Sequence, residues 1–396
     1  MLRPIGVSTW LLSGMGSALV ALTPVFTPAL TTAAEATERS PIAAGHPPMV
    51  LAQASTDHLS EQQKQRLSEL LNAAQEHIDA TDFAGAIAFY QQALQVNRAD
   101  PRLYSGIAYL HAREGNFDSA AEYYRQAIER ESRNLPFRYG LAYSLFQAER
   151  YREAASAYRD LLEIDRRQAE AQIGLGGSLL RLEDEDGARQ AYEAAVRIDP
   201  NNAQAYEAIG MLHFSQENYD EALRALERSQ QLDDSRASVY AAIAEIWLIR
   251  DQPGRALPQL QRAVQLNPQL SEAQFQLAEI LRAQGNQSAA LQHYEQAVEY
   301  QPDLTPAQAA LGEMLLAREQ YLRAVLAYRQ LSRVLPQDPG VRYNLALALW
   351  GQGNAQAALN TVEQALNLYQ RQEDEGGVTR AEALIEVWRQ EVDKNR

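Results

Sequence analysis

Apolar residues recur along this chain with the period of an α-helix, and the pattern is clearest between Ser271 and Leu304. Each half of this stretch carries one apolar stripe at helical spacing, which predicts two amphipathic helices. The stripe residues are Leu277, Ala278 and Leu281 in the first half and Ala290, Tyr294 and Ala297 in the second. Gly285-Asn286 lies between the halves and Pro302 follows the second, so the stretch predicts a helical hairpin.

The same pattern repeats every 34 residues without insertion and defines nine units. The units begin at Leu67, Pro101, Leu135, Ala169, Ala203, Ala237, Ser271, Thr305 and Pro339. Within each unit we number the places from 1 to 34. Place 8 is always Gly or Ala, place 20 is always Ala, and place 7 is large and apolar in every unit after the first. Small residues on both helices predict a close crossing, with the large residues filling the core.

This pattern resembles that of the tetratricopeptide repeat family, whose unit also has 34 residues. The resemblance covers residues 67–372 and includes an aromatic residue at place 24 in six units. These are Tyr90, Tyr124, Tyr158, Tyr192, Tyr294 and Tyr328. It implies an all-α fold, a right-handed superhelical solenoid of nine helix-turn-helix repeats plus a C-terminal capping helix. Because neighbours must stack to bury their stripes, Pro253 and Pro258 in the sixth unit predict the weakest joint.

The repeats leave two ends to account for. Residues 37–59 read as a flexible linker, and the capping-box pattern Ser60–Gln63 predicts the start of a repeat region spanning 60–372. In the last segment, 373–396, Thr379–Glu382 has the same capping pattern. The helix expected there presents one apolar face to the last repeat, through Ala381, Leu384, Ile385 and Trp388.

Residues 1–36 have the order of an export signal. Arg3 precedes an apolar run from Ile5 to Leu22, and Ala34-Glu35-Ala36 offers small residues for cleavage. Cleavage after Ala54 is a second possibility, and an uncleaved membrane anchor is the alternative because the run approaches the length of a spanning helix. Either reading places the folded part outside the cytoplasm, in the periplasm or another extracytoplasmic space.

Composition and the repeat pattern argue against most other functions. The net charge of −15 and the 51 acidic residues disfavour nucleic acid as a partner. The absence of cysteine removes disulfides and thiolate chemistry. No segment remains for a catalytic domain, so neither enzymatic activity nor a cofactor is expected. His77, His111 and His213 recur at place 11 and are interpreted as packing residues rather than metal ligands, and the acidic run 183–187 is interpreted as a solvated turn.

The resemblance implies instead that the first helices of successive units line a concave groove for a peptide or helix of another protein. The groove residues carried over by place are Arg102, Tyr109, Arg113, Tyr139, Tyr143, Phe146, Ile173, Leu180, Met211, Phe214, Glu245, Glu272, Phe275 and Glu279. The first ten form an aromatic and apolar wall. The groove residues of the later units make that part of the groove acidic. Glu313 adds to this negative charge, and the positive charge of Arg282 offsets it in part. Each aromatic residue either packs against a neighbouring helix or serves as a binding hot spot.

The function expected from these features is a non-enzymatic scaffold or adaptor for an amphipathic or aromatic protein segment. The alternative is a membrane-anchored assembly factor or chaperone for an envelope or membrane complex, which would retain residues 5–22.

Overall fold

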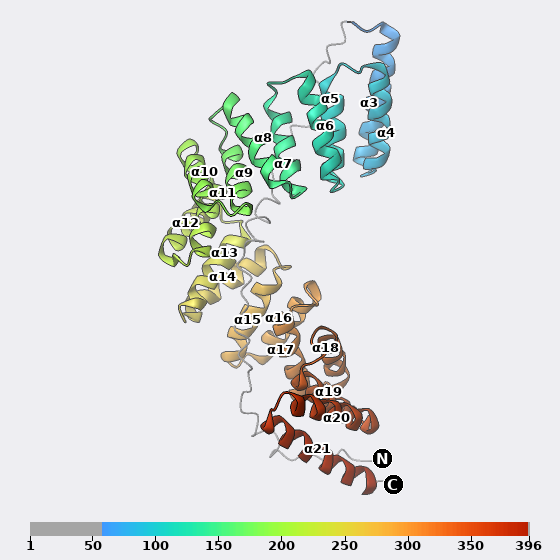
Figure 1. The fold of residues 1–396 in the computed structure, drawn as a ribbon, viewed down its shortest axis with the longest axis vertical. Coiled ribbons are helices and arrows are strands. Elements are labelled where there is room, and N and C mark those ends of the chain that lie inside the picture. Colours follow the sequence, from blue (N-terminus) through green and yellow to red (C-terminus); the bar gives the residue numbers. More distant parts are fainter. Residues whose placement is uncertain (1–57, 395–396) are drawn as a thin grey trace. The chain divides into compact units, whose positions relative to one another are not determined.

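The computed structural model describes residues 58–394, and every regular element in this range is an α-helix (Figure 1). The expected all-α repeat fold is confirmed. The predicted export signal and all but the last two residues of the predicted linker lie outside the described residues. No helix within residues 58–394 combines the length and apolar character that a membrane crossing requires.

The chain forms two compact units that meet in sequence between Asn218 and Tyr219. The first contains α3 Glu61–Asp79, α4 Phe83–Val96, α5 Pro101–Arg113, α6 Phe117–Arg130, α7 Leu135–Gln147, α8 Tyr151–Ile164, α9 Ala169–Arg181, α10 Glu185–Ile198 and α11 Ala203–Ser215. The second contains α12 Tyr219–Leu232, α13 Ala237–Ile249, α14 Pro253–Leu266, α15 Ser271–Ala283, α16 Gln287–Tyr300, α17 Thr305–Ala317, α18 Tyr321–Val334, α19 Pro339–Gly351, α20 Ala355–Arg371 and α21 Glu375–Lys394. From α5 onward, each first helix of a hairpin begins at the first residue of its repeat.

Each hairpin turns through the same backbone conformation. Place 15 lies in the left-handed region in all nine repeats, with φ between 54° and 86°. Glycine supplies it only at Gly115, Gly285 and Gly353, so the other repeats accept the strain of a side chain there. In four hairpins the side chain of the next residue caps the second helix, and the Asp184 carboxylate, for example, accepts from the Gly187 amide at 2.9 Å. The run 183–187 is therefore a turn and a helix start.

The small residues at places 8 and 20 are buried in every repeat, as their spacing predicted. The structure adds a role for the tyrosine at place 24, which inserts between place 8 of its own repeat and place 6 of the next. A Cβ on Gly176 would lie 2.5 Å from the ring of Tyr192 in the same repeat. A Cβ on Gly106 would lie 2.8 Å from the ring of Tyr90 in the preceding repeat. Where a tyrosine occupies this place, it therefore helps to pack consecutive hairpins against each other.

The C-terminal helix starts earlier than the sequence suggested. Helix α21 begins at Glu375, and the Asp374 carboxylate accepts from the Gly377 amide at 2.8 Å. The predicted cap at Thr379 is wrong, because this residue lies inside the helix and its hydroxyl donates to the Glu375 carbonyl at 2.9 Å. The predicted apolar face is buried, and the Trp388 ring stacks on Trp350 with centroids 4.5 Å apart.

The two prolines of the sixth repeat leave α14 uninterrupted. Pro253 occupies the first helical position, where its missing N–H would have no intrahelical acceptor. Pro258 lies one turn further on, inside the helix, where one hydrogen bond is lost. A weak joint at this repeat remains a prediction, and it depends on Pro258 alone.

Candidate partner-binding surface

In residues 58–218, two arginines that were predicted to line the groove interact with neighbouring side chains. The Arg102 guanidinium donates to both oxygens of the buried Asp100 carboxylate, each at 2.9 Å. Arg113 donates to the Tyr109 hydroxyl at 2.9 Å, and its guanidinium carbon lies 5.2 Å from the centroid of the Phe83 ring. The Arg113 side chain remains exposed, so it offers a charge beside two aromatic rings.

Four of the predicted groove residues are core residues instead. Phe146, Ile173, Met211 and Phe214 are at most 8% exposed, so their interpretation as a free binding wall is wrong for this conformation. The reason is that first helices of successive repeats also pack on one another. A Cβ on Gly177 of α9 would lie 3.6 Å from the Phe146 ring, which belongs to α7. Leu180, on α9, is half-buried.

The aromatic residues that keep some exposure are Tyr109, Tyr139 and Tyr143. The Tyr143 hydroxyl accepts from Gln147 at 2.9 Å, and its ring meets Phe117 edge to face with centroids 6.4 Å apart. Burial raises the pKa of the Tyr139 hydroxyl above its usual value, with smaller contributions from Glu170 and Tyr143. Both Tyr143 and Phe146 were predicted to line the groove on α7, and only Tyr143 is accessible enough to serve as an anchor.

In residues 219–394, Glu245 on α13 is half-buried and has no cationic side chain within ion-pair distance among the described residues. Burial, together with a smaller contribution from the negative charge of Glu272, raises the pKa of this carboxyl to about 7. Desolvation also raises the pKa of Glu272, which lies on α15. Consecutive first helices therefore bring the half-buried Glu245 close to the exposed Glu272, and no basic side chain neutralises either carboxylate among the described residues.

Glu279, on the same helix α15, has partners. Arg282 pairs with it at 2.6 Å, and the Tyr294 hydroxyl donates to the same carboxylate. Burial raises the pKa of Glu313 on α17, with Arg282 acting in the opposite sense. The half-buried Phe275 ring lies 6.1 Å from the Tyr294 ring, centroid to centroid. Helices α13, α15 and α17 thus form an acidic surface with one aromatic ring beside it.

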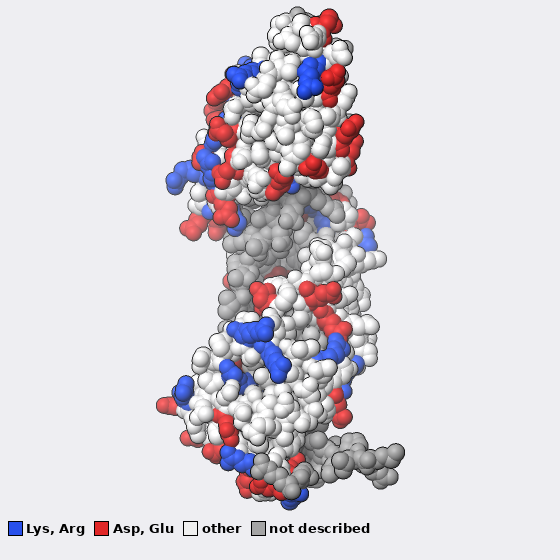
Figure 2. All heavy atoms as spheres, turned by 90° about the vertical axis from the view of Figure 1, so that its right-hand side faces the viewer, with Lys and Arg blue, Asp and Glu red and all other residues white. Residues whose placement is uncertain are grey.

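The excess of acidic residues does not make the whole surface uniform. On the face drawn in Figure 2, acidic and basic side chains lie interspersed in both units. Local clusters such as Glu245 and Glu272 therefore carry more information about a partner than the net charge does.

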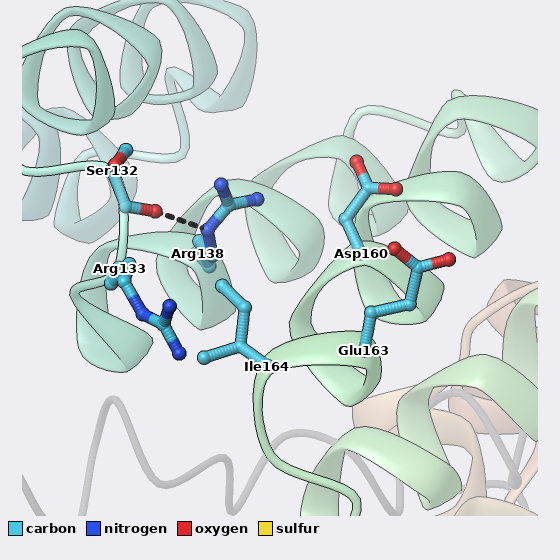
Figure 3. A pocket seen from close by; sticks show the side chains of 6 residues that line it. All are labelled: Ser132, Arg133, Arg138, Asp160, Glu163 and Ile164. Carbon is cyan, nitrogen blue, oxygen red and sulfur yellow. Dashed lines mark hydrogen bonds between the residues drawn. The ribbon is translucent and has the colours of Figure 1, made fainter.

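A polar pocket of about 410 Å³ lies among helices α7 and α8 and the turn before α7, and sequence reasoning did not find it (Figure 3). Its lining residues are Ser132, Arg133, Arg138, Asp160, Glu163 and Ile164. Arg138 donates to the Ser132 carbonyl at 2.7 Å.

Among residues 58–394, no group of three His, Asp or Glu side chains is placed to hold a metal ion. His77 instead contacts the Asp82 carboxylate at 2.6 Å.

A family model for the tetratricopeptide repeat matches residues 139–203, 188–237 and 309–374, and a second model of that description matches 271–304. A model for subunit 3 of the anaphase-promoting complex, cyclosome, matches residues 79–161. A TPR repeat-containing protein of Picosynechococcus sp. is 42% identical over 62 residues, which is 16% of this chain and 16% of that relative.

Among solved structures, a tetratricopeptide repeat protein from Parabacteroides merdae superposes with a TM-score of 0.51 at 17% identity. That match covers 63% of this chain and 99% of the other. PilF of Pseudomonas aeruginosa superposes with a TM-score of 0.48 at 21% identity, over 51% of this chain and 92% of the other. The first of these likenesses supports the fold. It does not identify a partner.

Proposed function

We propose, from the premise that this chain carries tetratricopeptide repeats, that it is an adaptor binding an amphipathic segment of another protein along the first helices of its hairpins. Proteins built from such repeats are protein-interaction scaffolds, and their fold is generally non-enzymatic. The bound segment is a peptide or helix that combines basic and apolar or aromatic side chains.

The observation that carries the proposal is the pair Glu245 and Glu272. Two neighbouring carboxylates, the half-buried Glu245 and the exposed Glu272, have no cationic side chain within ion-pair distance among the described residues and make a site that a cation would stabilise. A Lys or Arg of the partner supplies that cation, and Phe275 on the same helix as Glu272 supplies apolar contact for a neighbouring residue. In the other unit, Tyr143 supplies an accessible aromatic contact.

The test selects binding peptides from a random display library and measures their kinetics on the full chain. The selected peptides should be enriched in Lys or Arg next to apolar residues. Glu245→Gln combined with Glu272→Gln should slow their association and flatten its salt dependence, because the two carboxylates attract a basic side chain during encounter. Glu279→Gln is the matched control, since Arg282 already neutralises that carboxylate. Peptides without basic residues, or binding indifferent to the double substitution, would contradict the proposal.

Tyr143→Ala tests the aromatic contact separately. It should raise the dissociation rate and weaken binding by about 1 to 3 kcal/mol, as truncation of an interface aromatic does. Phe146→Ala is unsuitable for this purpose because the residue is buried and its loss would destabilise the fold.

We further propose that this binding takes place outside the cytoplasm, with Ile5–Leu22 as the apolar part of an export signal. N-terminal sequencing of the mature protein tests this. A start after Ala36 or Ala54 supports export with cleavage. Retention of residues 5–22 would favour the alternative function, an assembly factor or chaperone anchored to a membrane.

A further inference from the structure

Helix α18 exposes more apolar surface than its neighbours. Leu322 and Leu326 are 61% and 60% exposed, the highest values among the large hydrophobic residues of the described chain. They are four residues apart on one helix, so their side chains lie on the same side, one turn apart. The other side of α18 is buried in the core through Ala324, Val325 and Tyr328. The two leucines therefore contribute little to the packing of their own repeat.

Comparison of the nine repeats shows that the repeat does not require these leucines. They occupy places 18 and 22, and no other repeat has a large aliphatic residue at either place. The corresponding pairs are Ala84 and Ala88, Asp118 and Glu122, Arg152 and Ser156, Asp186 and Gln190, Asp220 and Arg224, Gly254 and Pro258, Ser288 and Gln292, and Gln356 and Asn360. Two exposed leucines at places that are polar or small in the other repeats reduce solubility, which indicates that they serve in binding.

The charges of α18 distinguish it as well. The helix contains three arginines and no acidic residue, within a chain whose net charge is −15. Arg323 pairs with Glu295 of α16 at 2.6 Å. Arg329 and Arg333 are exposed and have no carboxylate within ion-pair distance among the described residues. They follow Leu326 at intervals of three and four residues, so the four side chains form one stripe along the helix.

We propose that this stripe is a second docking surface, distinct from the inner surface of the repeats, and that it binds an acidic amphipathic helix of a partner protein. The partner's apolar residues, one helical turn apart, cover Leu322 and Leu326. Its carboxylates, one to two turns further along, pair with Arg329 and Arg333. Charge complementarity selects an acidic partner. An anionic membrane surface would gain from these arginines but would be repelled by the chain's acidic excess.

The ninth repeat provides a substitution that should preserve the fold. Leu322→Gln combined with Leu326→Asn places in the eighth repeat the residues that the ninth carries at the same places. The probe is a synthetic helical peptide with leucines four residues apart and glutamates in the two following turns. A peptide with lysines in place of the glutamates is its control. Circular dichroism of the double variant establishes that it folds.

The full chain should bind the glutamate peptide and not the lysine peptide, and the double variant should weaken binding by at least about tenfold. Arg329→Glu should weaken it similarly and reduce its salt dependence. Arg159→Glu, at the same place 25 in the third repeat, should leave it unchanged. Absence of saturable binding, equal binding of the lysine peptide, or an unaffected double variant would overturn the proposal.

Two further measurements address other occupants. Sedimentation velocity of the chain alone should show no self-association that depends on Leu322 and Leu326. Flotation with phosphatidylglycerol vesicles should show no binding that the double substitution removes. Self-association lost on substitution would assign the face to a second copy of the chain, and vesicle binding lost on substitution would assign it to a lipid surface. Either result would overturn the assignment to a partner helix.

Discussion

Neutralising Glu245 should stabilise the protein above neutral pH and leave it unchanged in acid. In the folded chain, burial and the charge of Glu272 raise the pKa of this carboxyl from 4.5 to about 7. Between these two values the folded state holds a proton that the unfolded state has released, so stability falls as pH rises. Above about pH 7 the folded carboxylate is charged and the penalty is complete. Glu245→Gln mimics the protonated form and removes the penalty.

The size of the effect follows from the pKa shift. One unit of pKa corresponds to about 1.4 kcal/mol, so the full shift sets an upper bound of about 3 kcal/mol. Glu245 is half-buried rather than enclosed, and solvent screening reduces this figure to about 1 to 2 kcal/mol. The gain belongs to the stretch containing α13 and α15, because a repeat array transmits stability mainly between neighbours.

Hydrogen exchange measured by mass spectrometry between pH 5 and pH 8 gives the local opening free energy of α13 and α15, once intrinsic exchange rates are corrected. Glu245→Gln should raise that free energy at pH 8 and not at pH 5. Glu279→Gln is the control and should not raise it at either pH, because it removes a carboxylate that Arg282 neutralises. An equal gain at both pH values, or a loss at pH 8, would refute the assignment of an unneutralised, partly desolvated carboxylate to Glu245.

Four substitutions test the packing of the repeats, and denaturant unfolding of the full chain combined with hydrogen exchange measures each. Gly106→Val should cost about 1 to 3 kcal/mol, because its side chain would enter the space of a buried tyrosine ring, and an unchanged stability would contradict the inserted-tyrosine core. Thr81→Gly should add about 1 kcal/mol by relieving a β-branched residue at φ 58°, and a loss would show that the turn is not strained. Pro258→Ala should slow the opening of α14 by restoring one helical hydrogen bond. If hydrogen exchange in the sixth repeat of the unsubstituted chain is already as slow as in the second and third repeats, this repeat is not a weak joint. Trp388→Ala should cost about 3 to 5 kcal/mol and detach α21 first, so uniform loss of protection across the chain would be the contrary result.

The helical hairpins could be predicted from the sequence because their signals are local and repeated nine times. A 34-residue period, an invariant Ala at place 20 and small residues at place 8 specify where each helix lies and which side it buries, and the structure begins its first helices at those residues from Pro101 onward. The start of α21 was misplaced by five residues because Asp374 and Thr379 can both serve as an N-cap. The hydrogen bonds of the folded helix decide between them, because the Asp374 carboxylate accepts from the Gly377 amide and the Thr379 hydroxyl donates to the Glu375 carbonyl.

The candidate binding surface was predictable only in part, because exposure depends on helices that are distant in sequence. Tyr143 and Phe146 both lie on the expected side of α7, yet the packing of α9 buries Phe146 and leaves Tyr143 accessible. The repeat pattern placed Glu245 and Glu272 on neighbouring first helices. Their altered ionisation arises from desolvation and charge proximity, which only the folded arrangement supplies. Periodicity thus determined the elements and their buried sides, and the tertiary structure decided which of the remaining side chains meet solvent, each other or a partner.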